Sequence, residues 1–393
     1  MRQKIKKVWF YGCWLCKFSF LMVFFLIITL PLRFNKKYKD LWLIGERPDE
    51  ARDNGYWLYK WILENKPETN VWFVLARKSV DYEKMPRKDL IIEPGSAKHY
   101  IYYILSKYSV STHMHGACPG KSFVIPFLLF VRHKKTVFLQ HGIVKNSLNL
   151  RGGLDVIIAS ADKEKDLIIK ANPRYKDKVY VTGLCRYDQL GDMSDEQEPS
   201  FILIMPTFRR YLRDVGRLKD ADKVFKQTTY CKKWNSVLNN LKLASIMEQN
   251  NLELVFFPHK DMQDLAHNLK SDNQRVKIGK TGEYDTQTLL KSASLLLTDY
   301  SSVFFDFIYM DKPVVFYQFD QKDFFSKHYA SSGEPYPFGD IFTDEESFVN
   351  EIEATVNRGY TMKKKYRDDA ATFYKYHDKK NCERNYNIIM GLE

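Results

Sequence analysis

The segment Leu297-Thr298-Asp299-Tyr300-Ser301-Ser302 combines groups that could bind an anion. The apolar residues 294–297 at its start predict a buried strand, and residues 303–310 after it predict a helix. Ser301 and Ser302 would then lie at a helix N-terminus, where free backbone N–H groups and the helix dipole favour negative charge. Their hydroxyls add two donors, which suits a diphosphate. The alternative for such a pair is a helix N-cap with no further role.

Two histidines follow other strand-like runs. His141 begins the sequence His-Gly-Ile-Val-Lys after the apolar residues 136–139, and His259 follows Pro258 after residues 252–257. Open α/β sheets place ligand chemistry at the carboxyl ends of their strands. One histidine there is more often a packed or capping residue. Two histidines and a serine-rich loop together indicate an active site.

A fourth segment, Met205-Pro206-Thr207-Phe208-Arg209, also ends an apolar strand and offers a guanidinium for phosphate. His113-Met114-His115 could suggest metal ligands, but no carboxylate lies near it in the sequence. We expect these residues to line a cleft or to pack. The chain has no Gly-x-Gly-x-x-Gly, no P-loop and no pair of Cys-x-x-Cys motifs. We therefore expect no tightly bound metal and no nicotinamide or flavin cofactor.

In their order along the chain, these motifs resemble those of the CDP-glycerol glycerophosphotransferase family, the teichoic acid primases and polymerases. The resemblance covers most of residues 38–390. Further elements that carry it are Glu46-Arg47, Asp53-Asn54-Gly55, Thr182-Gly183, Arg186-Tyr187-Asp188 and a looser Asp378…Glu383-Arg384. The chain departs from many members at Ile143-Val144, where they have Thr-Pro, and at Lys260, where they have Pro.

The resemblance implies that His141 and His259 are the two essential histidines. It also implies that other loop residues bind an activated donor. The expected donor-binding residues are Gly142, Lys145, Arg186, Thr207, Phe208, Arg209, Pro258, Ser301, Ser302 and Asp306.

The alternation of strand-like and helical stretches predicts mostly parallel sheets covered on both faces. We expect strands at residues 40–44, 71–75, 90–92, 108–112, 136–139, 155–159 and 178–182, and again at 201–205, 252–257, 276–278, 295–298 and 314–317. The expected fold is α/β and GT-B-like, with two Rossmann-like lobes and a cleft between them. The expected parts are a membrane-binding segment (1–37), an N-terminal acceptor-side lobe (38–190), a linker (191–199), a C-terminal donor-side lobe (200–365) and helices that pack across both lobes (366–393).

The charge distribution argues against nucleic-acid binding. The chain has 393 residues and a net charge of +13, of which residues 1–39 contribute +9 through nine Lys or Arg and no Asp or Glu. Residues 40–393 therefore carry only +4. The charge excess belongs to the N-terminal segment and not to a face of the globular part.

Residues 8–32 are almost wholly apolar and are broken only by Lys17. At about 1.5 Å per residue in a helix, this segment could span a bilayer. Basic residues lie on both sides of it, so the positive-inside preference gives no orientation for a single crossing. We favour a segment that lies in the interface or re-enters it, with both basic ends on the anionic cytoplasmic leaflet, over a true span.

Together these features predict a membrane-associated transferase on the cytoplasmic face of the cell membrane. It would move glycerol phosphate or ribitol phosphate from CDP-glycerol or CDP-ribitol to an undecaprenyl-linked saccharide or a polyol-phosphate chain and release CMP. His141 would be the base, and His259, Arg209 and the Ser301-Ser302 loop would neutralise the diphosphate. The alternatives are a GT-B glycosyltransferase that uses a nucleotide sugar and an inactive scaffold. The choices of polyol, of one unit or many, and of teichoic acid or capsule stay open.

Overall fold

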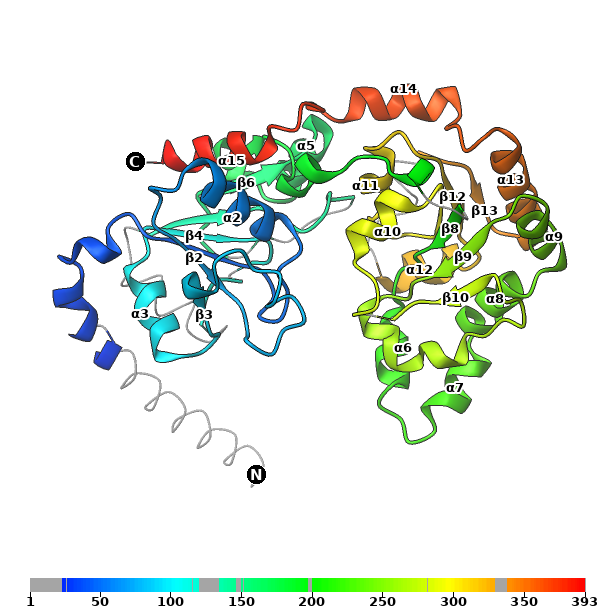
Figure 1. The fold of residues 1–393 in the computed structure, drawn as a ribbon, viewed down its shortest axis with the longest axis horizontal. Helices are drawn as coiled ribbons and strands as arrows, with labels where there is room; N and C mark the ends of the chain where they lie inside the picture. The colour runs from blue at the N-terminus through cyan, green and yellow to red at the C-terminus, as the bar shows by residue number, and fades with distance from the viewer. Residues whose placement is uncertain are drawn as a thin grey trace.

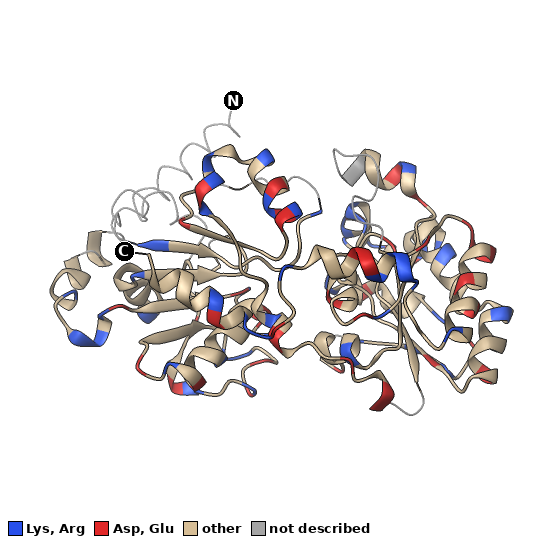
Figure 2. Ribbon diagram, turned by 90° about the horizontal axis from the view of Figure 1, so that it is seen from above, with Lys and Arg blue, Asp and Glu red and all other residues tan. Residues whose placement is uncertain are grey.

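The structure is a computed structural model that describes residues 23–25, 27–114, 116–119, 134–145, 150, 152–196, 200–280, 282–328 and 338–392. Two α/β lobes lie side by side in it, as two perpendicular views show (Figure 1 and Figure 2). In these residues each lobe contains one sheet whose strands are all parallel, and the sequence predicts mostly parallel sheets. Most of the apolar segment 8–32, together with His115, lies outside the described residues.

The N-terminal lobe is built on a seven-stranded sheet of order β3-β2-β1-β4-β5-β6-β7. Its strands are almost entirely buried, because helices and loops cover both faces of the parallel sheet. The strands are β1 (Trp42–Gly45), β2 (Val71–Val74), β3 (Ile91–Ile92), β4 (Tyr108–Ser111), β5 (Lys135–Phe138), β6 (Val156–Ala159) and β7 (Val179–Val181). The main helices are α2 (Asn54–Asn65), α3 (Ala97–Leu105) and α5 (Asp162–Ala171).

The C-terminal lobe has a six-stranded sheet of order β10-β9-β8-β11-β12-β13. The strands are β8 (Phe201–Ile204), β9 (Glu253–Phe256), β10 (Val276–Ile278), β11 (Leu295–Thr298), β12 (Val314–Tyr317) and β13 (Ile341–Phe342). The helices are α6 (Arg210–Val215), α7 (Ala221–Gln227), α8 (Thr229–Leu238), α9 (Leu241–Gln249), α10 (Thr286–Ser292), α11 (Phe304–Ile308), α12 (Gln321–His328) and α13 (Glu345–Asn357).

All twelve predicted strands are present within two residues of their expected ends. The prediction missed β13, which has only two residues and is too short to give an apolar pattern. The helix expected at residues 303–310 is shorter, because α11 covers only Phe304–Ile308. The GT-B-like arrangement of two Rossmann-like lobes is confirmed.

The end of the chain returns to the N-terminal lobe. Helix α14 (Lys364–Phe373) lies on the C-terminal lobe, whereas α15 (Asn381–Met390) packs against α2 (Figure 1). The Asp188 carboxylate accepts the backbone N–H groups of Asn381 at 2.8 Å and Cys382 at 2.7 Å, which caps the start of α15. Tyr386 stacks on Trp42 of β1 with ring centroids 5.4 Å apart.

The described part of the N-terminal segment is helical at residues 23–25 and 27–32. Phe25 is buried and stacks on Tyr100 of α3, with ring centroids 4.9 Å apart. Apolar side chains on other sides of this segment remain exposed, among them Ile27, Leu30 and Phe34. Within the described ranges, no helix is both long enough and apolar enough to cross a membrane.

Candidate active site

The carboxyl ends of both sheets face a cleft between the lobes. A cavity of about 610 Å³ occupies this cleft. Eight of the twelve predicted site residues line it, namely His141, Gly142, Lys145, Thr207, Phe208, His259, Ser301 and Ser302. Pro258 lines an adjoining cavity of about 430 Å³. The structure therefore brings most of the predicted residues to one place, and their roles there stay predictions.

The loop that follows β5 positions His141. Gln140 has a φ of 61°, which is unusual for a residue with a side chain, and it is 1% exposed. The buried Glu164 carboxylate accepts the backbone N–H of Val144 at 2.8 Å. Asn54 donates from Nδ2 to the Gln140 carbonyl at 2.8 Å. Hydrogen bonds from two helix starts, those of α2 and α5, thus fix the backbone around His141.

The environment of the His141 ring suits a general base. It stacks on His113 with ring centroids 4.7 Å apart, and burial lowers the pKa of His113 to about 3, so this neighbour stays neutral. The His141 ring is exposed to the cleft, yet desolvation by the cleft walls lowers its pKa. The Asp53 carboxylate and a hydrogen bond to the Thr112 backbone oppose this shift. A neutral imidazole at neutral pH can accept a proton.

His259 is held in a different way. It is the N-cap of the 3₁₀ helix Lys260–Asn268, and its Nδ1 accepts the backbone N–H of Asp261 at 3.1 Å. The neutral ring must therefore carry its proton on Nε2. Phe208 stacks on the ring at 5.6 Å, and desolvation lowers the pKa of His259. His259 is thus a neutral hydrogen-bond donor at the edge of the cleft.

The serine loop meets the His141 loop across the cleft. Ser301 and Ser302 lie between β11 and α11, as predicted. A Cβ atom added at Gly142 would lie 3.2 Å from the Ser302 hydroxyl oxygen, so a side chain there would crowd the contact between the lobes. Lys145 of the N-terminal lobe donates from Nζ to the Tyr300 carbonyl at 2.6 Å. Both loops therefore belong to one site.

The buried residues Arg186 and Asp306, together with the partly exposed Asp53, form an ion cluster between the lobes, which we call the interlobe ion cluster. The Arg186 guanidinium donates from Nε and Nη2 to Asp306, both at 2.7 Å, and from Nη1 to Asp53 at 2.8 Å. Nη1 also lies 3.2 Å from the His141 carbonyl, to which it donates. In this arrangement the two residues join the lobes next to His141, and donor binding by either residue stays a prediction.

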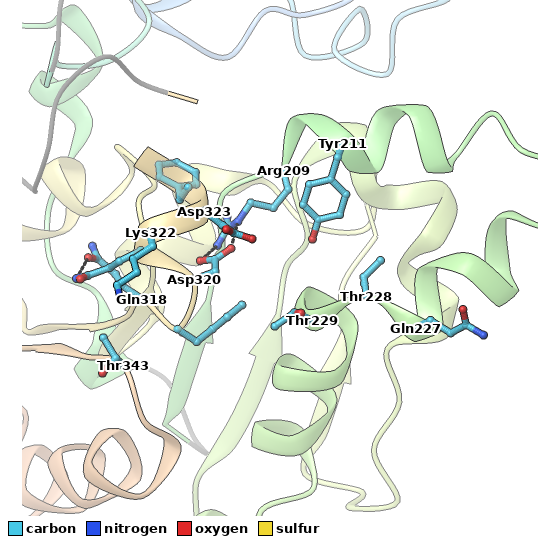
Figure 3. A pocket seen from close by; sticks show the side chains of 13 residues that line it. Arg209, Tyr211, Gln227, Thr228, Thr229, Gln318, Asp320, Lys322, Asp323 and Thr343 are labelled. Atoms are coloured by element: carbon cyan, nitrogen blue, oxygen red, sulfur yellow. Dashed lines mark hydrogen bonds and ion pairs between the residues drawn. The ribbon is translucent and has the colours of Figure 1, made fainter. Parts of the chain in front are cut away.

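The position of Arg209 differs from the expectation. Its guanidinium is 1% exposed, pairs with both oxygens of Asp320 at 2.8 and 3.0 Å, and lies 2.9 Å from Asp299. Figure 3 shows it at the wall of a separate cavity of about 730 Å³, beside Asp320 and Tyr211. The Tyr300 and Phe324 rings pack around it at 5.0 and 4.9 Å. It therefore does not face the cleft, and two carboxylates take up its charge.

The sequence model of the CDP-glycerol:poly(glycerophosphate) glycerophosphotransferase family matches residues 25–391. The chain belongs to this family.

Curated relatives of this glycerophosphotransferase family member are teichoic acid proteins. The minor teichoic acid biosynthesis protein GgaB of Bacillus subtilis (strain 168) is 29% identical over 376 residues, which are 92% of the chain and 40% of GgaB. The teichoic acid glycerol-phosphate primase of the same strain is 30% identical over 209 residues, 52% of the chain and 47% of the primase. The chain thus spans less than half the length of either relative.

Solved structures show the same fold. The wall teichoic acid polymerase TagF superposes with a TM-score of 0.62 at 15% identity, with 90% of each chain covered. A TagF variant soaked with CDPG gives a TM-score of 0.63 at 16% identity, with 92% of each chain covered. These likenesses support the two-lobed architecture of this glycerophosphotransferase family member.

Sequence reasoning assigned no role to several residues that shape the site. Asp53 and Asn54 are part of a family motif, but only the structure shows that they contact Arg186 and the His141 loop. Glu164 gave no signal, since a carboxylate in the first turn of a helix usually only complements the helix dipole. Arg47 lines both cleft cavities of this family member.

Proposed function

We propose that this chain transfers a polyol phosphate, glycerol phosphate or ribitol phosphate, from a CDP-polyol to a hydroxyl group and releases CMP. The acceptor would be a lipid-linked saccharide or a polyol-phosphate chain, in the synthesis of teichoic acid or a related polymer. The observation that carries the proposal is the meeting of His141 and His259, from opposite lobes, with the Ser301-Ser302 loop in one cavity. Membership of the family supports it.

In the proposed reaction, His141 takes the proton of the acceptor hydroxyl as its oxygen attacks the phosphorus that bears the polyol. A new P–O bond forms, and the bond between this phosphorus and the oxygen bridging to the cytidine phosphate breaks. CMP leaves with the bonding electron pair. The low pKa of His141 suits this role, because the base must be unprotonated at neutral pH.

The donor side would stabilise the charge on the leaving CMP. His259 can donate from Nε2, because its Nδ1 is bonded to the backbone of Asp261. The hydroxyls of Ser301 and Ser302 line the same cavity. Such preplaced donors stabilise the developing charge of phosphoryl transfer. We propose that they act without a tightly bound metal ion, so activity should survive dialysis against EDTA.

We also propose that the N-terminal segment attaches the protein to the cytoplasmic face of the membrane. The apolar sequence of residues 8–32 and the basic residues on both sides of it support this location. The described end of the segment agrees with it, since Ile27 is 61% exposed and Phe34 is 92% exposed. Attachment would raise the encounter rate with an acceptor carried on a lipid.

The test is CMP release by the full chain in detergent, with CDP-glycerol or CDP-ribitol and an undecaprenyl-linked disaccharide. We expect CMP from one donor, dependent on acceptor, which would also identify the polyol. Release of UDP or GDP from a nucleotide sugar, with no CMP from either donor, would overturn the proposal in favour of a glycosyltransferase. No turnover with any donor would favour a scaffold.

A further inference from the structure

Arg47 of the N-terminal lobe shares two cavities with the loops of the C-terminal lobe that carry His259 and Ser301. It follows β1 and lines the 610 Å³ cavity with both histidines as well as the adjoining 430 Å³ cavity with Pro258. The other residues that line both cavities are His259, Ser301 and Val303, all from the C-terminal lobe. Arg47 is therefore the one described residue of the N-terminal lobe that lines both cavities beside His259 and Ser301, although further residues of this lobe line each cavity.

The charge of Arg47 acts on histidines of both lobes. It lowers the pKa of His141 and of His113 in the N-terminal lobe, and also that of His259 in the C-terminal lobe. Desolvation is the larger cause in each case. Arg47 and both histidines line one cavity, so an anion bound there between the histidines would also meet the charge of the guanidinium.

The ion pair of Arg47 is weak compared with those of the buried arginines. Its Nη1 lies 3.5 Å from Glu50 Oε1, and its side chain is 44% exposed. The same Glu50 oxygen accepts a hydrogen bond of 2.6 Å from Lys260 of the opposite lobe. Arg186 and Arg209, in contrast, are buried and each bonds to both oxygens of one carboxylate. Arg47 can therefore exchange its partner for a ligand at little cost.

We propose that Arg47 is a further catalytic residue that contacts the phosphate being transferred. Phosphoryl transfer spreads negative charge over the oxygens of the moving group, and the planar guanidinium fork matches two of them. Arg47 shares its lobe with His141, the proposed base, so it lies on the side from which the acceptor attacks. The Ser301-Ser302 loop faces it across the cleft and would hold the leaving CMP. The inference rests on the proposed function.

The experiment compares Arg47→Ala, Arg47→Gln and Arg47→Lys with the wild type. For Arg47→Ala we expect kcat/KM for the CDP-polyol to fall roughly 10²- to 10³-fold, as for removal of other preplaced donors. The kcat/KM of Arg47→Gln should fall by a similar factor. The kcat/KM of Arg47→Lys should fall less, because lysine keeps the positive charge. Inhibition by CMP should change less than about threefold, since CMP lacks the transferred phosphate. Melting temperature reports folding, and the polar, uncharged Arg47→Gln serves if Arg47→Ala does not fold.

The matched control is Arg87→Ala, an exposed arginine of the same lobe that pairs with Asp89 at 2.6 Å away from the cavities. Its kcat/KM and its inhibition by CMP should match those of the wild type. If the wild type is active and the kcat/KM of Arg47→Ala lies within threefold of it, the role of Arg47 is overturned and the proposed function stands. An inactive wild type would instead overturn the proposed function. A parallel loss of CMP affinity and kcat/KM would overturn the assignment to the transferred phosphate, because Arg47 would then bind the nucleotide.

Discussion

The two histidine loops follow strands at different positions in the two sheets, and the protein also holds them differently. The His141 loop follows β5, which lies between β4 and β6, and the His259 loop follows β9, which lies between the edge strand β10 and β8. His141 stands on a backbone fixed by Glu164 and Asn54, and its ring remains exposed to the cleft. The His259 ring itself bonds to the backbone of its own 3₁₀ helix. The first arrangement suits a group that must change its protonation, and the second suits one that must not.

The largest effect is expected for the base. His141→Ala should lower kcat by roughly 10²- to 10⁴-fold, because no other group takes the proton of the acceptor hydroxyl. CMP release in a stopped assay measures it, with melting temperature as the check on folding. His267→Ala, which removes an exposed histidine paired with Asp222 at 2.9 Å, should behave as the wild type. Full activity of His141→Ala would refute the role of this residue.

His259→Asn should separate the two functions of the second histidine. Asparagine is a good N-cap and can accept the Asp261 N–H, but it cannot place a donor where Nε2 lies. We expect kcat to fall roughly 10²- to 10³-fold with an unchanged melting temperature. His259→Ala should lose the cap as well, at about 1 kcal/mol of unfolding free energy. Equal melting temperatures of the two variants would show that the cap contributes nothing.

Asp306→Asn tests whether the interlobe ion cluster stabilises the fold and positions the His141 loop without contributing to CMP binding. The change leaves the buried Arg186 with one carboxylate instead of two, and we expect a loss of about 3 kcal/mol of unfolding free energy. Urea denaturation measures it. Since Arg186 also donates to the His141 carbonyl, kcat should fall in this variant while inhibition by CMP changes less. If Asp306→Asn has the same free energy of unfolding as the wild type, the interlobe ion cluster does not stabilise the fold.

The pH dependence should show the low pKa of the base. Activity is lost as pH falls through this pKa, because the protonated imidazole cannot accept a proton. Desolvation lowers the pKa of His141 from 6.5, so the acid limb of kcat should lie below pH 6.5. Asp53→Asn removes a carboxylate that raises this pKa and should move the limb further down, whereas Arg47→Ala should move it up. An acid limb above pH 7 in the wild type would contradict this assignment.

Lys260→Pro should have the smallest effect. Lys260 is the first residue of its 3₁₀ helix, where proline is favoured, and His259 before it has φ −53° and ψ 147°, which a following proline accepts. The change removes exposed ion pairs to Asp49 at 3.0 Å and Glu50 at 2.6 Å, worth less than about 1 kcal/mol. We expect a melting temperature within about 2 °C of the wild type. A larger decrease in melting temperature would show that the ion pairs of Lys260 help to hold the two lobes together.

The sequence was most informative where one segment determines its own structure. Buried parallel strands are continuous apolar runs, so β8 and β11 were placed to within one residue. Arg209 was predicted to bind phosphate because the local sequence shows only that an arginine follows a strand. Its partner Asp320 lies 111 residues later, and no local pattern announces that pair. Glu164 and Asn54 support His141 only through tertiary contacts, which also leave no pattern in the sequence.

The return of α15 to the N-terminal lobe has a consequence for how the protein folds. Asp188 meets the backbone of Asn381 across 193 residues, and Trp42 meets Tyr386 across almost the whole chain. During synthesis, the N-terminal lobe leaves the ribosome with one of its covering helices not yet made. It can complete its core only after the entire C-terminal lobe has emerged. The order in which the lobes are made is therefore not the order in which they are finished, and unfolding of one lobe should weaken the other.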